Sequence, residues 1–148
     1  MRIEELEVVC QEAARNLVQR QSSPVPTAIV LPLADKTRVT SLETWPDDDA
    51  GRLGVLERFS EEVAGPLSAP CYGFVAEALA PSEGGPVDVV VVVYGARRHH
   101  PRITAAVLHD GELGEFSPSE SLAATAMPFL APLQRTVDAA PAPDAFSG

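Results

Sequence analysis

Basic side chains are scarce in this sequence, and lysine is nearly missing, with Lys36 as its single example. The 148 residues include 21 acids and 11 bases, which gives a formal net charge of -10. A chain with this charge repels the phosphates of nucleic acids and of anionic membranes unless a local basic patch overcomes the field. We therefore expect neither nucleic acid nor a membrane surface as a partner.

Cysteine is also rare, and its placement argues against a disulfide or a zinc site. Cys10 and Cys71 lie in apolar surroundings, away from any histidine and outside any CxxC pattern. The simplest interpretation is two buried free thiols, and a disulfide or a zinc site is the alternative. We expect no metal ion and no cofactor.

Targeting signals and long hydrophobic runs are missing as well. The opening residues, MRIEELEVVC, carry acids where a secretory signal needs a basic flank and an unbroken apolar run. No segment approaches the roughly 18 apolar residues of a membrane span. These absences predict a soluble, cytoplasmic protein, and the preference for arginine, alanine, valine and proline is typical of GC-rich bacterial genomes.

The standard catalytic patterns are not found either. The chain contains no GxxxxGK[ST] phosphate loop, no GxGxxG dinucleotide fingerprint, no GxSxG elbow, no HExxH and no paired-cysteine zinc motif. Catalysis does not require one of these motifs, so their absence lowers the expectation of an enzyme without excluding one.

Two helices are predicted from the spacing of apolar residues. Over residues 3–21 these residues recur at steps of three and four, which indicates an amphipathic helix. Residues 45–66 show a second apolar side, with Asp47 placed to cap the helix and Gly65 and Pro66 placed to end it.

A third helix is predicted near the C-terminal end of the chain. Ser117, Pro118 and Glu120 match the cap, first and third positions of a capping box, so we expect this helix to begin there. Residues 139–148 are rich in alanine and proline and predict a disordered tail. The organisation expected is a single domain over residues 1–138 followed by this tail.

Five segments have the composition of β-strands: 27–33, 38–43, 71–80, 87–94 and 102–109. Together with the helices they predict the order α-β-β-α-β-β-β-α. We expect an α+β domain with a five-stranded, mainly antiparallel sheet and helices on one or both faces. Pro32 predicts that the first strand lies at the sheet edge or ends near this residue.

The strand over residues 87–94 is apolar on both of its faces. Val89, Val91 and Val93 alternate with Val90 and Val92, so neither face is suited to water. Strands of this kind must be covered on both sides. Either the three helices do this, with two on one side and the C-terminal helix on the other, or a second copy of the chain covers part of one face. We expect a homodimer.

The most concentrated group of basic residues is YGARRHHPR, residues 94–102. Gly95 and Pro101 are turn residues, so the segment predicts a long hairpin connection between two strands. Arginine offers a planar fork that suits a phosphate or an acidic partner. The candidate partner-binding residues are Arg97, Arg98, His99, His100 and Arg102. Solvated surface charge, or contact with the acid-rich helices of a neighbouring copy, are the alternatives.

A second candidate set contains Glu77, His109 and Asp110. Glu77 is a carboxylate in an apolar strand, which is costly unless it is paired or exposed, and a pocket that raises its pKa is the alternative. His109 and Asp110 resemble an acid/base pair, but Asp-Gly also favours a tight turn. His109 lies nine residues after His100, roughly 30 Å along an extended strand, so we expect no three-histidine metal site.

The sequence therefore predicts a small, non-enzymatic module for protein interaction or regulation that self-associates. The alternative is a small-molecule-binding protein or hydrolytic enzyme that uses Glu77, His109 and Asp110 in a pocket at the end of the sheet.

Overall fold

A computed structural model describes residues 2–20, 25–123 and 125–140, and it shows an α+β fold. Its helices are α1 (Ile3–Arg20), α2 (Asp49–Phe59), the π-helix η1 (Ser60–Ala64), the 3-10 helix η2 (Pro128–Leu130) and α3 (Ala131–Asp138). Its strands are β1 (Ala28–Pro32), β2 (Thr37–Ser41), β3 (Cys71–Ala80), β4 (Val87–Ala96), β5 (His99–His109), β6 (Glu112–Leu113) and β7 (Glu120–Ser121). None of the helices in the described ranges is both long and apolar enough to cross a membrane.

The strands form one curled antiparallel sheet in the order β2-β1-β3-β4-β5-β6, and β7 also pairs with β5. The long strands β3, β4 and β5 follow one another as hairpins, with Phe74 opposite Val93 and Val93 opposite Ile103. Strand β1 lies between β2 and β3, so Pro32 is the last residue of an interior strand and not part of an edge strand.

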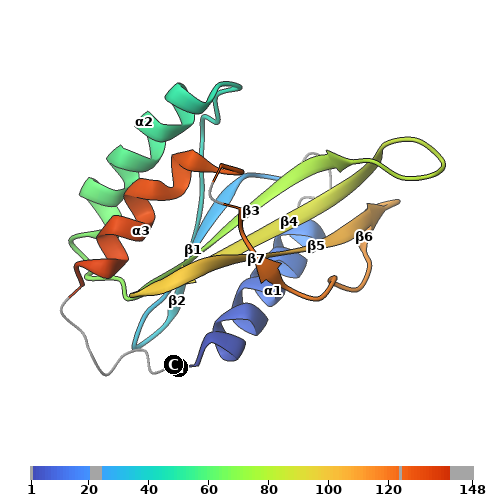
Figure 1. Cartoon of the computed structure of the whole chain (residues 1–148). Helices are drawn as coiled ribbons and strands as arrows, with labels where there is room; N and C mark the ends of the chain where they lie inside the picture. The colour runs from blue at the N-terminus through green and yellow to red at the C-terminus, as the bar shows by residue number, and fades with distance from the viewer. Residues whose placement is uncertain (1, 21–24, 124, 141–148) are drawn as a thin grey trace.

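Helices cover both faces of the sheet (Figure 1). Helix α1 packs on one face, where Leu6 and Cys10 contact Val75 and its neighbours, while α2, η1 and α3 pack on the other. The expected division placed the C-terminal helix alone on one side, and this was wrong. Phe129 and Leu130, just before α3, belong to the same core as Leu56 of α2, so α3 is held on the face that α2 covers.

The structure corrects the expected count of five strands to seven and removes the helix expected from Ser117. Ser117 N donates to Ala105 O at 2.8 Å, and Thr104 Oγ1 donates to Ser117 O. The segment that begins at Ser117 is therefore paired with the edge of β5 and continues into β7. Its backbone groups are used in this pairing and cannot form a helix. The capping-box pattern was overridden by this tertiary pairing, and helical structure begins only at Pro128.

The boundaries of the second helix also differ from the prediction. Helix α2 begins at Asp49 because Asp48, rather than Asp47, is its N-cap and accepts a hydrogen bond from Gly51 N at 3.3 Å. Most of the predicted tail, residues 141–148, lies outside the described residues. Ala140, which follows α3, is buried.

Helix α1 approaches the sheet closely at Gly73. A Cβ atom added to this glycine would overlap Cys10 Sγ and would lie 3.2 Å from Val30 Cβ. Cys10 and Cys71 are both buried and carry free thiols. The absence of a side chain at Gly73 therefore sets the distance between α1 and β3.

The buried thiols predict that the protein loses stability in alkali. Burial raises the pKa of Cys71 from 9.0 to about 12, and it also raises the pKa of Cys10 and of the Tyr72 phenol. Above about pH 9 the unfolded chain releases thiol protons that the native state retains, so the free energy of unfolding falls as the pH rises through the range from about 9 to 12. Urea denaturation at stepped pH measures this fall. Cys71→Ala should make it shallower, and a slope that Cys71→Ala leaves unchanged would contradict the assignment.

Candidate functional site

The basic segment at residues 94–102 is a tight turn and not the long connection expected. Strand β4 continues to Ala96 and β5 begins at His99, with these two residues opposite each other, so only Arg97 and Arg98 lie between the strands. Arg98 has a left-handed backbone, with φ at 62°. The pairing of β4 with β5 shifts register between Tyr94 and Ala96. This shift allows both strands to extend through a glycine-containing stretch whose composition predicts a loop.

The C-terminal end of α3 holds this turn in place. Arg98 N donates to Asp138 Oδ1 at 2.7 Å, and Arg97 Nε donates to Asp138 O at 3.4 Å. Gln134 Nε2 also donates to Ala96 O at 2.9 Å. The turn is thus part of the packed structure, and of its two arginines Arg98 is the more exposed.

The following basic residues contact the residues on either side of β7. His100 Nε2 lies 2.7 Å from Leu122 O, and Arg102 donates to Ser119 from Nε (3.2 Å, to Oγ) and from Nη2 (2.9 Å, to O). His99 lines a cavity together with these residues and Tyr94. Several of the five predicted partner-binding residues thus make hydrogen bonds within the fold. That these residues also contact a partner stays a prediction.

Tyr94 connects this region to α1. Its hydroxyl donates to Glu7 Oε1 at 2.8 Å. Burial raises the pKa of the Tyr94 phenol above its ordinary value, and the contact with Glu7 acts in the same direction. The phenol therefore stays protonated as a donor at neutral pH.

The structure does not bring Glu77 together with His109. Glu77 lies opposite Val90, on the α1 face of the sheet, and accepts a hydrogen bond from Val25 N at 3.3 Å. His109 lies two residues after Val107 and shares the other face with it by the alternation of a strand. The expected sheet-end pocket would need both residues on the same face.

His109 and Asp110 do contact each other, but in an exposed turn. His109 Nε2 lies 3.2 Å from Asp110 Oδ2, and their side chains are 84% and 89% exposed. Asp110 and Gly111 both have positive φ angles, at 51° and 78°, which is the geometry of a two-residue hairpin turn between β5 and β6. Within the described ranges, no group of three or more histidine, cysteine or acidic residues could hold a metal ion.

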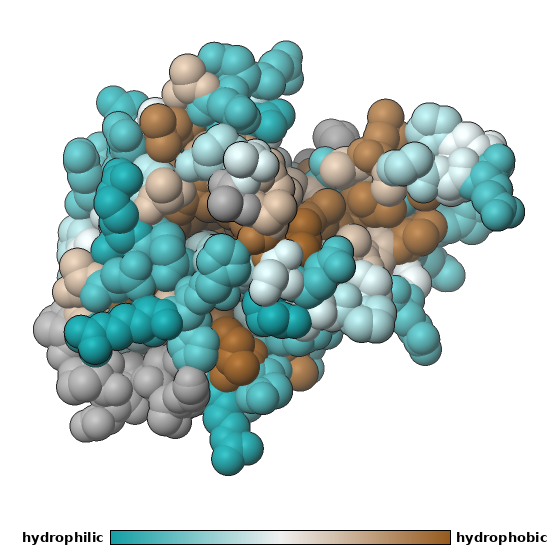
Figure 2. All heavy atoms as spheres, viewed as in Figure 1, coloured by the Kyte–Doolittle hydropathy of each residue, from teal (hydrophilic) through white to brown (hydrophobic). Residues whose placement is uncertain are grey.

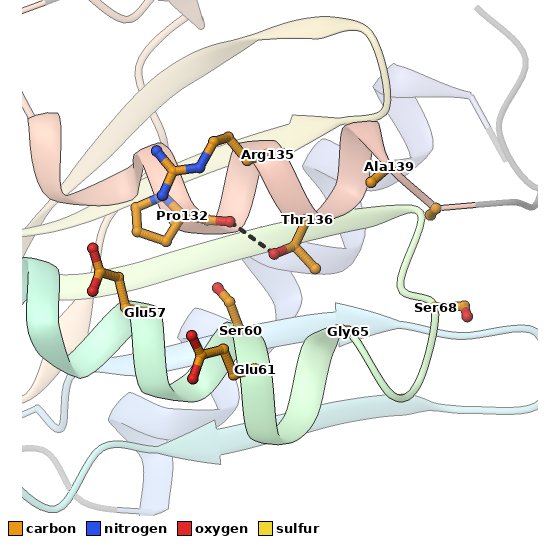
Figure 3. A pocket seen from close by; sticks show the side chains of 10 residues that line it. Glu57, Ser60, Glu61, Gly65, Ser68, Pro132, Arg135, Thr136 and Ala139 are labelled. Carbon is orange, nitrogen blue, oxygen red and sulfur yellow. Dashed lines mark hydrogen bonds between the residues drawn. The ribbon is translucent and has the colours of Figure 1, made fainter.

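A cavity of about 580 Å³ lies between the α2–η1 helix and α3 (Figure 3). Its lining residues are Glu57, Ser60, Glu61, Gly65, Ser68, Pro132, Arg135, Thr136, Ala139 and Ala140. Sequence reasoning missed this site because it depends on two helices more than 60 residues apart in the chain. The one local signal is the pair of like charges four residues apart, Glu57 and Glu61, on the same side of a helix.

The α2–η1 side of the cavity includes a π-helical turn. Gly65 N donates to Ser60 O at 2.7 Å, a bond that spans five residues in place of the usual four. A Cβ atom on Gly65 would lie 2.9 Å from that same oxygen, so glycine fits the closing position. Turns of this kind often occur at functional sites.

The distal ends of the long strands carry a second distinctive surface, which we call the open face. It consists of Ala76, Ala78, Ala80, Val87, Val89, Val91, Ala105 and Val107. Register places these residues in three rows across β3, β4 and β5, on the same face as the helix layer. Strands β3 and β4 extend beyond α2 and α3 here (Figure 1), and Figure 2 shows hydrophobic surface continuing over them.

The open face lies between an acidic tip and an aromatic border. The tip is the β3–β4 connection, where Glu83 is exposed. The border is the row before Ala76: Phe74 packs against Trp45 and Phe129, with ring centroids 5.4 and 5.7 Å away. The guanidinium of Arg52 lies over the rings of Trp45 and Phe129, at 5.4 and 5.6 Å from their centroids.

The chain matches no family model, and the comparisons found no significantly similar curated protein or solved structure.

Proposed function

We propose that this protein is a non-enzymatic interaction module of the cytoplasm that self-associates as a two-fold dimer through the open face. The observation that carries the proposal is the open face itself, eight apolar residues in register on three strands. Val89 at its centre is buried, and its neighbours in the same row, Ala78 and Val107, are exposed, Val107 by 49%. Contiguous apolar surface of this kind marks an interaction site, because exposing it to water is unfavourable. The two buried free thiols support a reducing compartment.

A second copy of the chain is the occupant that fits this surface. In a two-fold arrangement the distal strands of each copy lie across the open face of the other, and the acidic tip of each reaches the aromatic border of its partner. There Glu83 would meet the cation of Arg52, so charge complementarity orients the pair. The basic turn at Arg97 and Arg98 lies at the opposite end of β4 and remains available to a different, acidic partner.

Replacing Val107 by aspartate tests this proposal. We expect the wild-type protein to show about twice the chain mass of 15.7 kDa by light scattering. Val107→Asp places a carboxylate within the apolar contact, where it must give up hydration, and should weaken self-association by about 100-fold. Sedimentation equilibrium over a concentration series measures the change.

Val8→Asp is the matched control, since Val8 is 52% exposed on α1, on the other side of the sheet. This variant should dimerise as well as the wild type. A wild-type protein that stays monomeric at high concentration, or a Val107→Asp variant that still dimerises normally, would refute the proposed interface.

A further inference from the structure

Ser60 presents an unpartnered hydroxyl to the cavity between the α2–η1 helix and α3. Its residue is 5% exposed, and among the described residues its Oγ is the one buried side-chain polar atom that has no hydrogen-bond partner. Figure 3 shows this side chain directed from the helix toward α3, into the cavity. Buried polar groups nearly always have a partner, so an unpaired hydroxyl at a cavity points to a ligand group that completes it.

Two carboxylates lie beside this hydroxyl on the same helix. Glu57 and Glu61 are four residues apart, so they lie on one side of the helix and repel each other. The residues that directly follow these two glutamates, Arg58 and Glu62, form an ordinary ion pair at 3.7 Å. The cavity side of the helix therefore carries concentrated negative charge, while its outer side is balanced.

Arg135 of α3 supplies positive charge on the opposite wall. It lines the same cavity, yet within the described part of the chain no carboxylate oxygen lies within 4.0 Å of its guanidinium. The two walls thus carry opposite charges that the cavity keeps apart. Thr136, the other polar residue of α3 at the site, already donates its hydroxyl proton to Pro132 O at 2.9 Å.

We propose that this cavity binds a small zwitterion, a molecule with one ammonium group and one carboxylate, as in a free amino acid. The ammonium group lies between Glu57 and Glu61, the carboxylate pairs with Arg135, and a polar atom of the ligand bonds Ser60 Oγ. The hydroxyl can donate to a carboxylate or accept from an ammonium. A volume of about 580 Å³ accommodates such a ligand.

This charge arrangement also determines what the cavity rejects. A simple cation is attracted by Glu57 and Glu61 but repelled by Arg135. A simple anion is attracted by Arg135 but repelled by the two carboxylates. The charged groups at the rim are exposed, so each ion pair contributes little, and we expect affinities of order millimolar. The site is separate from the open face and does not depend on self-association.

The first experiment is a titration of the full chain, labelled with nitrogen-15, followed by amide chemical shifts. Glycine, β-alanine and γ-aminobutyrate vary the distance between the two charges, and methylammonium and acetate carry one charge each. We expect saturable shifts confined to residues 57–68 and 132–140 for at least one zwitterion. The single-charge probes should bind about tenfold more weakly, since each loses one ion pair with hydrogen bonds.

Variants at the cavity separate a binding role from a structural one. Ser60→Ala should weaken zwitterion binding about tenfold, yet it should leave the free energy of unfolding unchanged or raise it, because it removes an unpaired buried hydroxyl. Arg135→Gln should weaken binding similarly. Arg58→Gln is the matched control for Arg135→Gln: it removes a guanidinium from the outer side of the helix, where Arg58 pairs with Glu62, and binding should stay within about twofold of wild type.

Three results would overturn the proposal: no saturable shifts with any zwitterion at tens of millimolar, binding of methylammonium or acetate as tight as that of the zwitterions, or full binding by Ser60→Ala. Zwitterion binding by Val107→Asp at wild-type affinity would support it as a site independent of the dimer.

Discussion

Replacing Gly73 by alanine should lower the free energy of unfolding by about 3 kcal/mol, the upper part of the range for adding a methyl group to a closed core. The new Cβ would overlap Cys10 Sγ and press on Val30 Cβ at 3.2 Å. Both neighbours are fully buried, and Gly73 is paired on both sides, with Val30 of β1 and Tyr94 of β4, so neither the helix nor the strand can move freely. Urea denaturation, followed by circular dichroism, measures the loss.

Two further variants test the cause of this loss. Cys10→Ala in the Gly73→Ala background removes the sulfur that the new methyl group meets, so it should restore part of the lost stability. Gly54→Ala adds the same methyl group to α2, where no atom lies within 4 Å, and should stabilise the protein by about 0.5–1 kcal/mol through helix propensity. Wild-type stability for Gly73→Ala would show that the contact between α1 and β3 is not as close as described.

Replacing Phe74 by alanine should cost about 3–5 kcal/mol, as expected for removing a buried aromatic ring. Phe74 is 1% exposed and contacts both Trp45 and Phe129, which also contact each other at 5.3 Å between ring centroids. The loss combines hydrophobic burial with the cavity left between three rings. It should appear as a large shift of the midpoint in urea denaturation.

The single tryptophan of the chain gives this prediction a local readout. Trp45 should become more hydrated in Phe74→Ala, and its fluorescence emission should move to longer wavelength in the native state. Leu79→Ala, in the same strand but at a side chain 70% exposed, should change stability by less than about 0.5 kcal/mol and leave the emission unchanged. Equal effects of the two variants would contradict the role given to the aromatic cluster.

The longer elements of this fold could be predicted because their signals are local. The strand over residues 71–80 has the predicted bounds, and the first helix begins at Ile3 as its apolar spacing indicates. Strands β6 and β7 could not be predicted, since two residues are too few to show a period. They form because the edge of β5 offers unpaired backbone groups to the segment beside it.

The candidate sites were less accessible to this reasoning. The concentration of Arg97, Arg98 and their neighbours was visible, but their contacts with Asp138, Leu122 and Ser119 come from segments distant in the sequence. Ser60 carried no signal at all, because a serine in a helix is ordinary until its surroundings are known.

By itself the sequence determined the α+β class, the order of the long elements and the apolar character of both sheet faces, because side-chain periodicity and turn chemistry act within a few residues. The tertiary structure alone decided which helix covers which face, that residues 117–121 lie along β5 instead of forming a helix, and that Ser60 lies unpartnered opposite Arg135. These features follow from packing and pairing between distant segments, whose free energies exceed local preferences and are not encoded in any short stretch of the chain.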